Sequence, residues 1–284
     1  MPHVLAAQEA KPKPEPIIDV HQHTTYTGRS NQQLLAHQRA MGITTSVLLP
    51  AGRLYGLEAG CGGNESVIEA AREHPQEYIY FANEVADLPD AISTIRKYLE
   101  QGAKGIGEQK FYIEADSEYI HRIAELAAEF RVPVLMHFQF ATYNTSIERF
   151  HKVLEKHPQA NFIGHAQTWW ANIDQQHDQR TLYPTGKVTP GGITDRLLSD
   201  YPNMFGDLSA GSGLNSLLRD EDHTRGFLER HQNKLLYGSD CTDTIGRGPG
   251  CQGAQTLAAV RRLVPNKVAE RKILYENAKA LLKL

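Results

Sequence analysis

Six side chains with metal-binding chemistry lie at or near the ends of short β-branched runs of the chain. They are His21, His23, Glu108, His137, His165 and Asp240. A lone histidine at a strand end usually satisfies a local hydrogen bond, but four imidazoles converging with two carboxylates need a compensating cation. These nitrogen and oxygen ligands suit Zn²⁺, Mn²⁺, Ni²⁺ or Fe²⁺ and argue against Ca²⁺. The sequence therefore predicts a site for one or two divalent cations, with Zn²⁺ as the first expectation.

The runs that would position these side chains alternate with amphipathic helical stretches. The runs span residues 17–23, 44–50, 78–83, 103–111, 132–138, 161–165, 204–209 and 234–240. Their starts are about 25 to 43 residues apart, close to what a strand, a crossover helix and the next strand require. Ser30 with Gln33, and Thr145 with Glu148, fit the capping box of a helix start.

Parallel strands in this number predict an α/β fold, a single-domain (β/α)8 TIM barrel over residues 17–284. An open doubly wound sheet is the alternative, disfavoured because no glycine-rich phosphate loop follows the first run. In such a barrel the functional groups lie at the carboxyl ends of the strands. Alternate strand residues point to one side, so His21 and His23 share the inner face. Asp207, at the end of the seventh run, is placed to accept a hydrogen bond from the ring nitrogen of a ligand histidine that does not bind the cation, which would orient the ring.

Four further residues are candidates for contacting a substrate. Arg53 and Lys187 are candidates to bind a substrate carboxylate, although a solvated surface charge explains Lys187 equally well. The longest interruption, residues 167–194, predicts a lid or substrate loop. Trp169 directly follows the sixth run, where an indole ring can wall a pocket. Lys110 lies two residues after Glu108 and so shares its face.

Composition limits the classes of partner. The 284 residues carry a net charge of −3, without the basic excess that nucleic-acid binding demands. No apolar run approaches the roughly 18 residues of a membrane span. Three scattered cysteines suit a reducing compartment, so we expect a cytoplasmic protein. Residues 1–16 carry four prolines and predict a flexible tail; the remnant of an export signal is the alternative.

Taken in order, several motifs resemble the amidohydrolase superfamily of metal-dependent barrels, in particular its amidohydrolase 2 branch. They are residues 17–23 (IIDVHQH), 134–137 (VLMH), 162–165 (FIGH), 236–240 (LYGSD) and 273–278 (ILYENA). The resemblance implies that His21, His23 and Asp240 bind the more buried cation. It also implies that His137 and His165 bind a second cation or, in members with one cation, supply a ligand and a polarising imidazole.

The fourth strand leaves two assignments open. Relatives with two cations place a bridging glutamate or a carboxylated lysine there, and the setting of Glu108 resembles the glutamate-bridged members. We therefore expect Glu108 to bridge and Lys110 to contact the substrate. A structural ion pair between Glu108 and Lys110 is the alternative, and it would be compatible with a single cation.

The expected activity is metal-dependent hydrolysis of a small ester, lactone or amide, with a carboxylated substrate implied by the resemblance. The cation would lower the pKa of a bound water and polarise a carbonyl oxygen. Asp240 would take the proton of the attacking water and deliver it to the leaving group, with His165 as the other catalytic candidate. The alternatives are a decarboxylase or hydratase on the same site, a deoxyribonuclease, and a non-catalytic ligand-binding barrel. The sequence leaves a homo-oligomer open.

Overall fold

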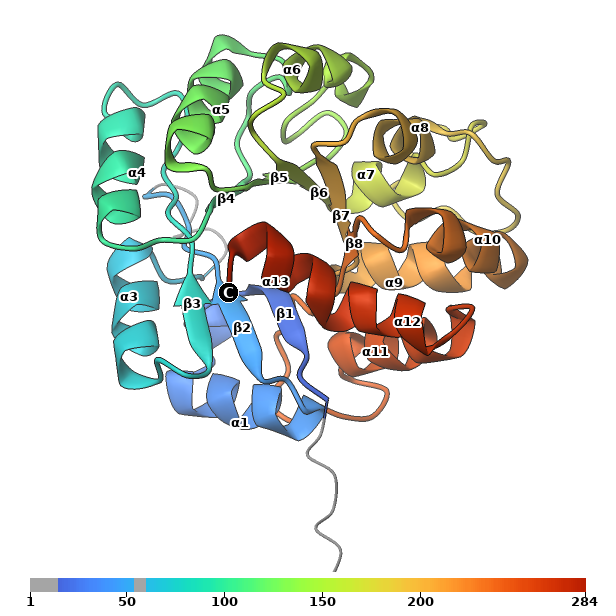
Figure 1. Ribbon diagram of the computed structural model, residues 1–284, viewed down its shortest axis with the longest axis horizontal. Helices are drawn as coiled ribbons and strands as arrows, with labels where there is room; N and C mark the ends of the chain where they lie inside the picture. The colour runs from blue at the N-terminus through green and yellow to red at the C-terminus, as the bar shows by residue number, and fades with distance from the viewer. Residues whose placement is uncertain (1–14, 54–59) are drawn as a thin grey trace, which may run out of the picture.

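The computed structural model describes residues 15–53 and 60–284, where short parallel strands alternate with helices around a ring (Figure 1). The strands are β1 (Ile18–Gln22), β2 (Thr45–Leu48), β3 (Tyr78–Tyr80), β4 (Ile106–Gln109), β5 (Val134–His137), β6 (Phe162–His165), β7 (Met204–Asp207) and β8 (Leu235–Leu236). The longer helices are α1 (Asn31–Met41), α3 (Asn64–Glu73), α4 (Ala91–Glu100), α5 (Glu118–Phe130), α8 (Ile193–Asp200), α9 (Ala210–Leu218), α10 (Glu221–His231) and α11 (Gln252–Leu263). The shorter ones are α6 (His151–Lys156), α7 (Gln167–Ala171), α12 (Lys267–Arg271) and α13 (Asn277–Leu282).

The strands form two parallel sheets, β1-β2-β3 and β4-β5-β6-β7-β8, which are joined at both edges by backbone hydrogen bonds. At one joint Ala82, just after β3, bridges Ile106 of β4, and Gly107 N donates to Ala82 O at 2.9 Å. At the other joint Val20 N of β1 donates to Tyr237 O, just after β8, at 3.0 Å. These bonds close the ring, so the predicted (β/α)8 barrel is confirmed.

Apolar side chains from several strands meet inside the ring. One buried cluster joins Ile18 and Val20 of β1 to Val47, Leu49, Phe81, Leu135, Ile163 and Leu236, together with Ala278 and Leu282 of α13. Helix α13 lies near the ends from which strands start, since Asn277 Nδ2 donates to Leu235 O at 2.9 Å and Lys283 Nζ donates to Arg131 O at 2.8 Å. The carboxyl ends of the strands therefore lie at the other end of the ring, away from α13 (Figure 1).

The two capping predictions have different outcomes. The box at the start of α1 is confirmed: Gln33 N donates to Ser30 Oγ at 3.2 Å, and Ser30 N donates to Gln33 Oε1 at 2.9 Å. The box at Thr145 is wrong, because the following 3₁₀ turn (Ile147–Arg149) is preceded by Ser146 without a side-chain cap. Thr145 is instead held in extended pairing, with its N–H donating to Ile113 O at 3.0 Å.

The predicted tail, residues 1–16, lies outside the described residues except for Glu15 and Pro16. Pro16 O accepts a hydrogen bond from Arg271 NH1 at 2.9 Å, so this end of the tail is fixed against α12. Throughout residues 15–53 and 60–284, every helix falls short of the length and apolar character of a membrane span.

Candidate metal centre

The structure brings the six predicted ligands together at the carboxyl end of the ring. His137 and His165 are the last residues of β5 and β6, Glu108 lies in β4, and Asp240 follows β8. The donor atoms fall into three overlapping groups, each with all its atoms within 4.8 Å of one another. The groups are His21 with His23 and Glu108, His21 with His165 and Asp240, and Glu108 with His137 and His165.

An irregularity in β1 turns His21 toward this cluster, beside His23, which directly follows the strand. The pairing register of β1 with β2 shifts between Asp19 and Gln22. Val20 lies in the interior apolar cluster, and strict alternation would place His21 on the opposite face. The irregularity removes that conflict, as expected of a β-bulge. His21 Nε2 and His23 Nε2 end 3.1 Å apart.

Glu108 lies between two pairs of histidines and presents a different oxygen to each. Its Oε2 is 3.7 Å from His21 Nε2 and 3.5 Å from His23 Nε2. Its Oε1 is 2.5 Å from His137 Nδ1 and 3.7 Å from His165 Nε2. The Glu108 carboxylate thus lies between His21 and His23 on one side and His137 and His165 on the other. It belongs to both sets of donors.

Asp240, which follows β8, faces histidines of both donor sets. Its Oδ1 is 3.8 Å from His21 Nε2 and 3.7 Å from His23 Nε2, and its Oδ2 is 3.9 Å from His165 Nε2. The residue adopts a φ of 46°, and its N–H donates to His21 O at 2.9 Å. Within residues 15–53 and 60–284, Asp240 Oδ1 is buried without a hydrogen-bond partner. A buried carboxylate oxygen left in this way is costly unless a cation compensates it.

Asp207 and Ser209 fix the orientation of two of the imidazoles. His21 Nδ1–H donates to Asp207 Oδ2 at 2.8 Å. Ser209 Oγ donates to the same carboxylate at 2.7 Å and accepts from His165 Nδ1–H at 2.9 Å. The orienting role expected for Asp207 is therefore visible. Ser209 was not predicted, although its place two residues after Asp207 at a strand end could have indicated it.

The other two imidazoles have similar anchors. His23 Nδ1–H donates to Leu49 O at 2.8 Å, and His137 Nε2–H donates to Gln139 Oε1 at 3.2 Å. Each of the four histidines thus has one nitrogen anchored by a group outside the donor cluster and turns its other nitrogen toward the carboxylates. Such anchoring is typical of histidines that bind metal ions.

The protonation preferences of the cluster suit metal ligands. Burial lowers the pKa of His137, and burial together with His21 lowers the pKa of His23 to about 3. Burial acts to raise the pKa of Glu108, but His137 and His21 hold it well below its usual range. Neutral imidazoles and an ionised carboxylate are the forms that bind metal.

His21 and Asp240 show where positive charge is favoured. Burial acts to lower the pKa of His21, but the carboxylates of Asp240 and Asp207 raise it well above its usual value. Burial raises the pKa of Asp240 to about 6. The centre of the cluster therefore stabilises a positive charge, as a divalent cation requires, and the residues present fit such an ion.

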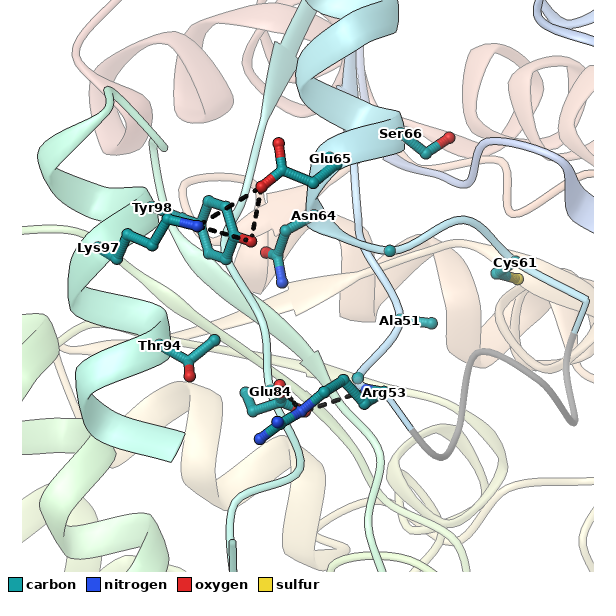
Figure 2. A pocket seen from close by; sticks show the side chains of 12 residues that line it. Ala51, Arg53, Cys61, Asn64, Glu65, Ser66, Glu84, Thr94, Lys97 and Tyr98 are labelled. Carbon is teal, nitrogen blue, oxygen red and sulfur yellow. Dashed lines mark hydrogen bonds and ion pairs between the residues drawn. The ribbon is translucent and has the colours of Figure 1, made fainter. Parts of the chain in front are cut away.

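A small hollow of about 20 Å³ lies against these groups. It is lined by His23, Tyr26, Pro50, Ala51, Cys61, Glu108, Lys110 and Asp240. A larger hollow of about 520 Å³ shares Ala51 and Cys61 with it (Figure 2). Lys110 is half-buried, and its ammonium lies 5.5 Å from the centre of the Tyr143 ring.

Arg53 and Lys187 are both engaged in ion pairs. Arg53 lines the larger hollow, where its Nε lies 2.6 Å from Glu84 Oε2 (Figure 2), and its NH2 lies 2.7 Å from Asp90 Oδ1. Lys187 is 77% exposed, and its Nζ lies 2.9 Å from Asp220 Oδ1 just before α10. Lys187 is not among the described residues that line either hollow.

Trp169 is placed in the core and not in a pocket wall. Its side chain is fully buried and stacks on Phe138 with ring centroids 5.8 Å apart. A Cβ on Gly164 would lie 2.4 Å from the indole, so this glycine makes room for the ring. The start of the predicted loop is the helix α7, which turns Trp169 inward.

Comparison with known proteins decides the family. The model of the amidohydrolase family (Amidohydro_2) matches residues 18–284. The chain belongs to this family. Its members are metal-dependent enzymes, which agrees with the donor groups described above. A search of the curated proteins gives no significant match.

Solved structures confirm the fold at low sequence identity. An uncharacterised TIM-barrel protein from Bordetella bronchiseptica is 15% identical, with a TM-score of 0.68 over 95% of this chain and 99% of that one. A probable 2-pyrone-4,6-dicarboxylic acid hydrolase from Acinetobacter baumannii is 13% identical, with a TM-score of 0.62 over 94% and 99%. A 5-carboxyvanillate decarboxylase from Novosphingobium aromaticivorans, solved with manganese, is 14% identical, with a TM-score of 0.55 over 89% and 80%.

Proposed function

We propose that this protein is a metal-dependent hydrolase that cleaves a small ester, lactone or amide carrying a carboxylate. The observation that carries the proposal is the position of Glu108, whose two oxygens face different pairs of histidines. Two donor sets that share one carboxylate suit the paired cations of hydrolytic centres. The first set is His21, His23, Glu108 and Asp240, and the second is Glu108, His137 and His165.

Cations held by these donors would supply Lewis acidity toward a carbonyl oxygen and toward the water that attacks it. The remaining chemistry belongs to the chain. The Asp240 carboxylate lines the small hollow, and its Oδ1 has no hydrogen-bond partner in the described part of the chain. It accepts the proton of the attacking water and returns it to the leaving group. His165 is less suited to this task, because Ser209 holds its Nδ1 and its Nε2 faces Glu108 and Asp240.

Lys110 supports a carboxylated substrate. Among the described residues that line the small hollow, it is the only lysine or arginine. An ammonium there would bind a substrate carboxylate by a charge-assisted hydrogen bond. In the larger hollow both basic side chains are paired, since Arg53 Nε lies 2.6 Å from Glu84 Oε2 and Lys97 Nζ lies 3.5 Å from Glu65 Oε1 (Figure 2). Because the small hollow has a volume of only about 20 Å³, only a small reacting group of the substrate fits beside the donors.

Decarboxylation is the second candidate. A carboxylate held by Lys110 beside the same donors could leave as CO₂ if Asp240 delivered a proton to the carbon left behind. The similarity to the 5-carboxyvanillate decarboxylase favours this reaction as the alternative. The two reactions differ in whether a water oxygen enters the product.

Turnover in ¹⁸O-labelled water separates the two candidates. Metal-replete protein is incubated with a panel of carboxylated lactones and esters and with hydroxybenzoates, and the products are analysed by mass spectrometry and CO₂ trapping. Hydrolysis predicts one ¹⁸O in the carboxylate formed from the cleaved acyl group and no CO₂, with activity lost on chelation and restored by added cation. CO₂ release without ¹⁸O incorporation would replace the hydrolase by the decarboxylase. Asp240→Asn is the matched control, because it keeps the shape of the side chain but removes its basicity.

A further inference from the structure

A second cluster of metal-binding side chains lies apart from the proposed active site, between α1 and the segment that joins β8 to α11. His37, Cys241, Asp243 and Cys251 each contribute one donor atom, and all four atoms lie within 4.8 Å of one another. His37 lies on α1, and Cys251 directly precedes α11. His37 and both cysteines are buried, whereas the Asp243 side chain is 19% exposed.

The donor spacing is close to that of a tetrahedral zinc site. Cys251 Sγ is 3.5 Å from both Cys241 Sγ and His37 Nε2. Ligands about 2.3 Å (sulfur) and about 2.0–2.1 Å (nitrogen) from a tetrahedral zinc are separated from one another by about 3.5–3.8 Å. His37 Nε2 and Asp243 Oδ1 are closer, at 2.6 Å, and would separate by less than about 1 Å on binding. A disulfide would instead require the sulfurs to approach to about 2.05 Å.

Backbone N–H groups donate hydrogen bonds to both sulfurs. Gly253 N–H donates to Cys241 Sγ at 3.0 Å, and Ala254 N–H donates to Cys251 Sγ at 3.4 Å. Both amides belong to the first turn of α11, where the helix dipole also favours thiolates. These two hydrogen bonds favour negative charge on each sulfur, which is the charge that a metal-bound thiolate carries.

Backbone N–H groups also donate hydrogen bonds to the Asp243 carboxylate of the cluster. Asp243 Oδ2 accepts hydrogen bonds from Ile245 N at 3.3 Å and Gly246 N at 3.2 Å, which leaves Oδ1 facing His37. A Cβ on Gly246 would lie 2.3 Å from His37 O, so glycine lets the segment pack directly on α1. The donor positions are thus set by close packing of the segment.

The imidazole can present a lone pair to the cluster. The side-chain amide of Gln38 lies 3.3 Å from His37 Nδ1 and 2.7 Å from Ser46 Oγ. Exchange of the amide oxygen and nitrogen, which occupy equivalent positions, lets His37 Nδ1–H donate to Gln38 Oε1 while Gln38 Nε2 donates to Ser46 Oγ. His37 Nε2 is then free to coordinate.

We propose that His37, Cys241, Asp243 and Cys251 bind a structural zinc ion. Two thiolates, an imidazole and a carboxylate form a closed four-ligand set, which is typical of structural rather than catalytic zinc. Binding releases the two thiol protons to solvent and gives a centre of net charge −1. Arg29, which is buried and donates to Asp243 O at 2.9 Å, supplies a balancing positive charge.

The site would fasten the segment that carries Asp240. Cys241 directly follows Asp240 in the chain, and Gln252 Nε2, next to Cys251, donates to Asp240 O at 2.9 Å. The ion is therefore a positioning element for the active-site rim and takes no part in the reaction itself.

Cobalt substitution distinguishes this site from the proposed catalytic one. The full chain is loaded with Co²⁺, and the intense near-ultraviolet band of sulfur-to-cobalt charge transfer is recorded. The band is expected in wild type and in His21→Ala. It is expected to weaken in Cys241→Ser and in Cys251→Ser, each of which keeps one thiolate, and to disappear in the double variant Cys241→Ser/Cys251→Ser. Cys61→Ser is the matched control, because Cys61 lines the hollow of the catalytic site and its loss should leave the band unchanged. An undiminished band in both single variants, or a band that persists in the double variant, overturns the proposal.

A second measurement uses the wild-type protein alone, so its result does not depend on whether the variants fold. Zinc-loaded protein is treated with an alkylating reagent before and after chelation, and the modified cysteines are identified by mass spectrometry. The proposal predicts that Cys241 and Cys251 are protected with zinc and alkylated without it. Equal modification in both states, or a disulfide between the two cysteines in the zinc-treated protein, overturns it.

Discussion

Replacing Asp207 by asparagine tests whether the histidine anchors matter for metal binding. In the wild type, Asp207 Oδ2 accepts the Nδ1–H of His21 at 2.8 Å, and Oδ1 accepts from Ser209 N at 3.0 Å. If the asparagine keeps its Oδ1 on Ser209 N, its amide nitrogen faces His21 Nδ1–H, and two donors oppose each other. His21 then moves its proton to Nε2, the nitrogen that faces Glu108 and Asp240, or loses its anchor.

The size of the effect follows from the bond that is lost. A buried hydrogen bond to a charged acceptor contributes about 1.5–3 kcal/mol, which corresponds to roughly a 10- to 150-fold change in an equilibrium constant. Loss of a partner behind a metal-bound histidine costs roughly 10- to 100-fold in metal affinity. We therefore expect Asp207→Asn to weaken metal binding by one to two orders of magnitude, while the fold survives.

Calorimetric titration with Mn²⁺ measures this effect, because imidazole and carboxylate donors bind Mn²⁺ whereas thiolates favour softer ions. Asp195→Asn is the matched control: Asp195 Oδ1 lies 2.6 Å from His231 Nε2, a buried carboxylate–histidine pair outside the metal centre. The control should retain wild-type affinity. An Asp207→Asn protein that is folded by circular dichroism and binds Mn²⁺ within twofold of wild type would refute the reasoning.

Three further outcomes are expected. Asp240→Asn keeps a coordinating oxygen and tolerates the positive φ of 46°, so metal content should fall modestly while kcat drops roughly 10²- to 10⁴-fold; near-wild-type kcat would assign the proton transfer elsewhere. Lys110→Met should raise KM at least about tenfold for a carboxylated substrate but not for its neutral ester analogue, and an equal rise for both would contradict carboxylate binding. Burial acts to raise the pKa of Asp195, but His231 and Arg230 hold it at about 2 against a usual 3.8, so the stability that its ionised form contributes is present above pH 4 and lost toward pH 2. Urea unfolding across this range should show a weaker pH dependence in Asp195→Asn, and an unchanged slope would contradict the assignment.

The ring of donors could be predicted because strand position alone determines it. Parallel strands of a closed barrel bring their carboxyl ends to one rim, so His137, His165 and Asp207 meet there however the loops fold. Strand alternation predicts that His21 and His23 point to the same side of the strand. The inward orientation of His21 also depends on the register shift in β1, which residue types alone do not predict. The division of donors by Glu108 is a matter of side-chain orientation, which spacing alone does not determine.

Contacts that depend on helix direction and loop packing could not be predicted. Trp169 follows His165 closely in the chain, yet α7 turns its ring back onto Gly164, so proximity in sequence does not make it a pocket residue. Lys187 and Arg53 are held by carboxylates on other elements, and such pairings become visible only in three dimensions. The cluster around His37 joins α1 to a segment more than 200 residues later, a distance over which sequence pattern carries no signal.

Anomalous diffraction from crystals grown with Mn²⁺ tests whether Glu108 bridges two cations. We expect two anomalous peaks, one on each side of the Glu108 carboxylate. One should lie within coordination distance of His21 and His23, and the other within coordination distance of His137 and His165. A single peak with Glu108 bound to one ion would retain a metal centre but contradict the bridging role. A map with no peak among these side chains would contradict the metal centre itself.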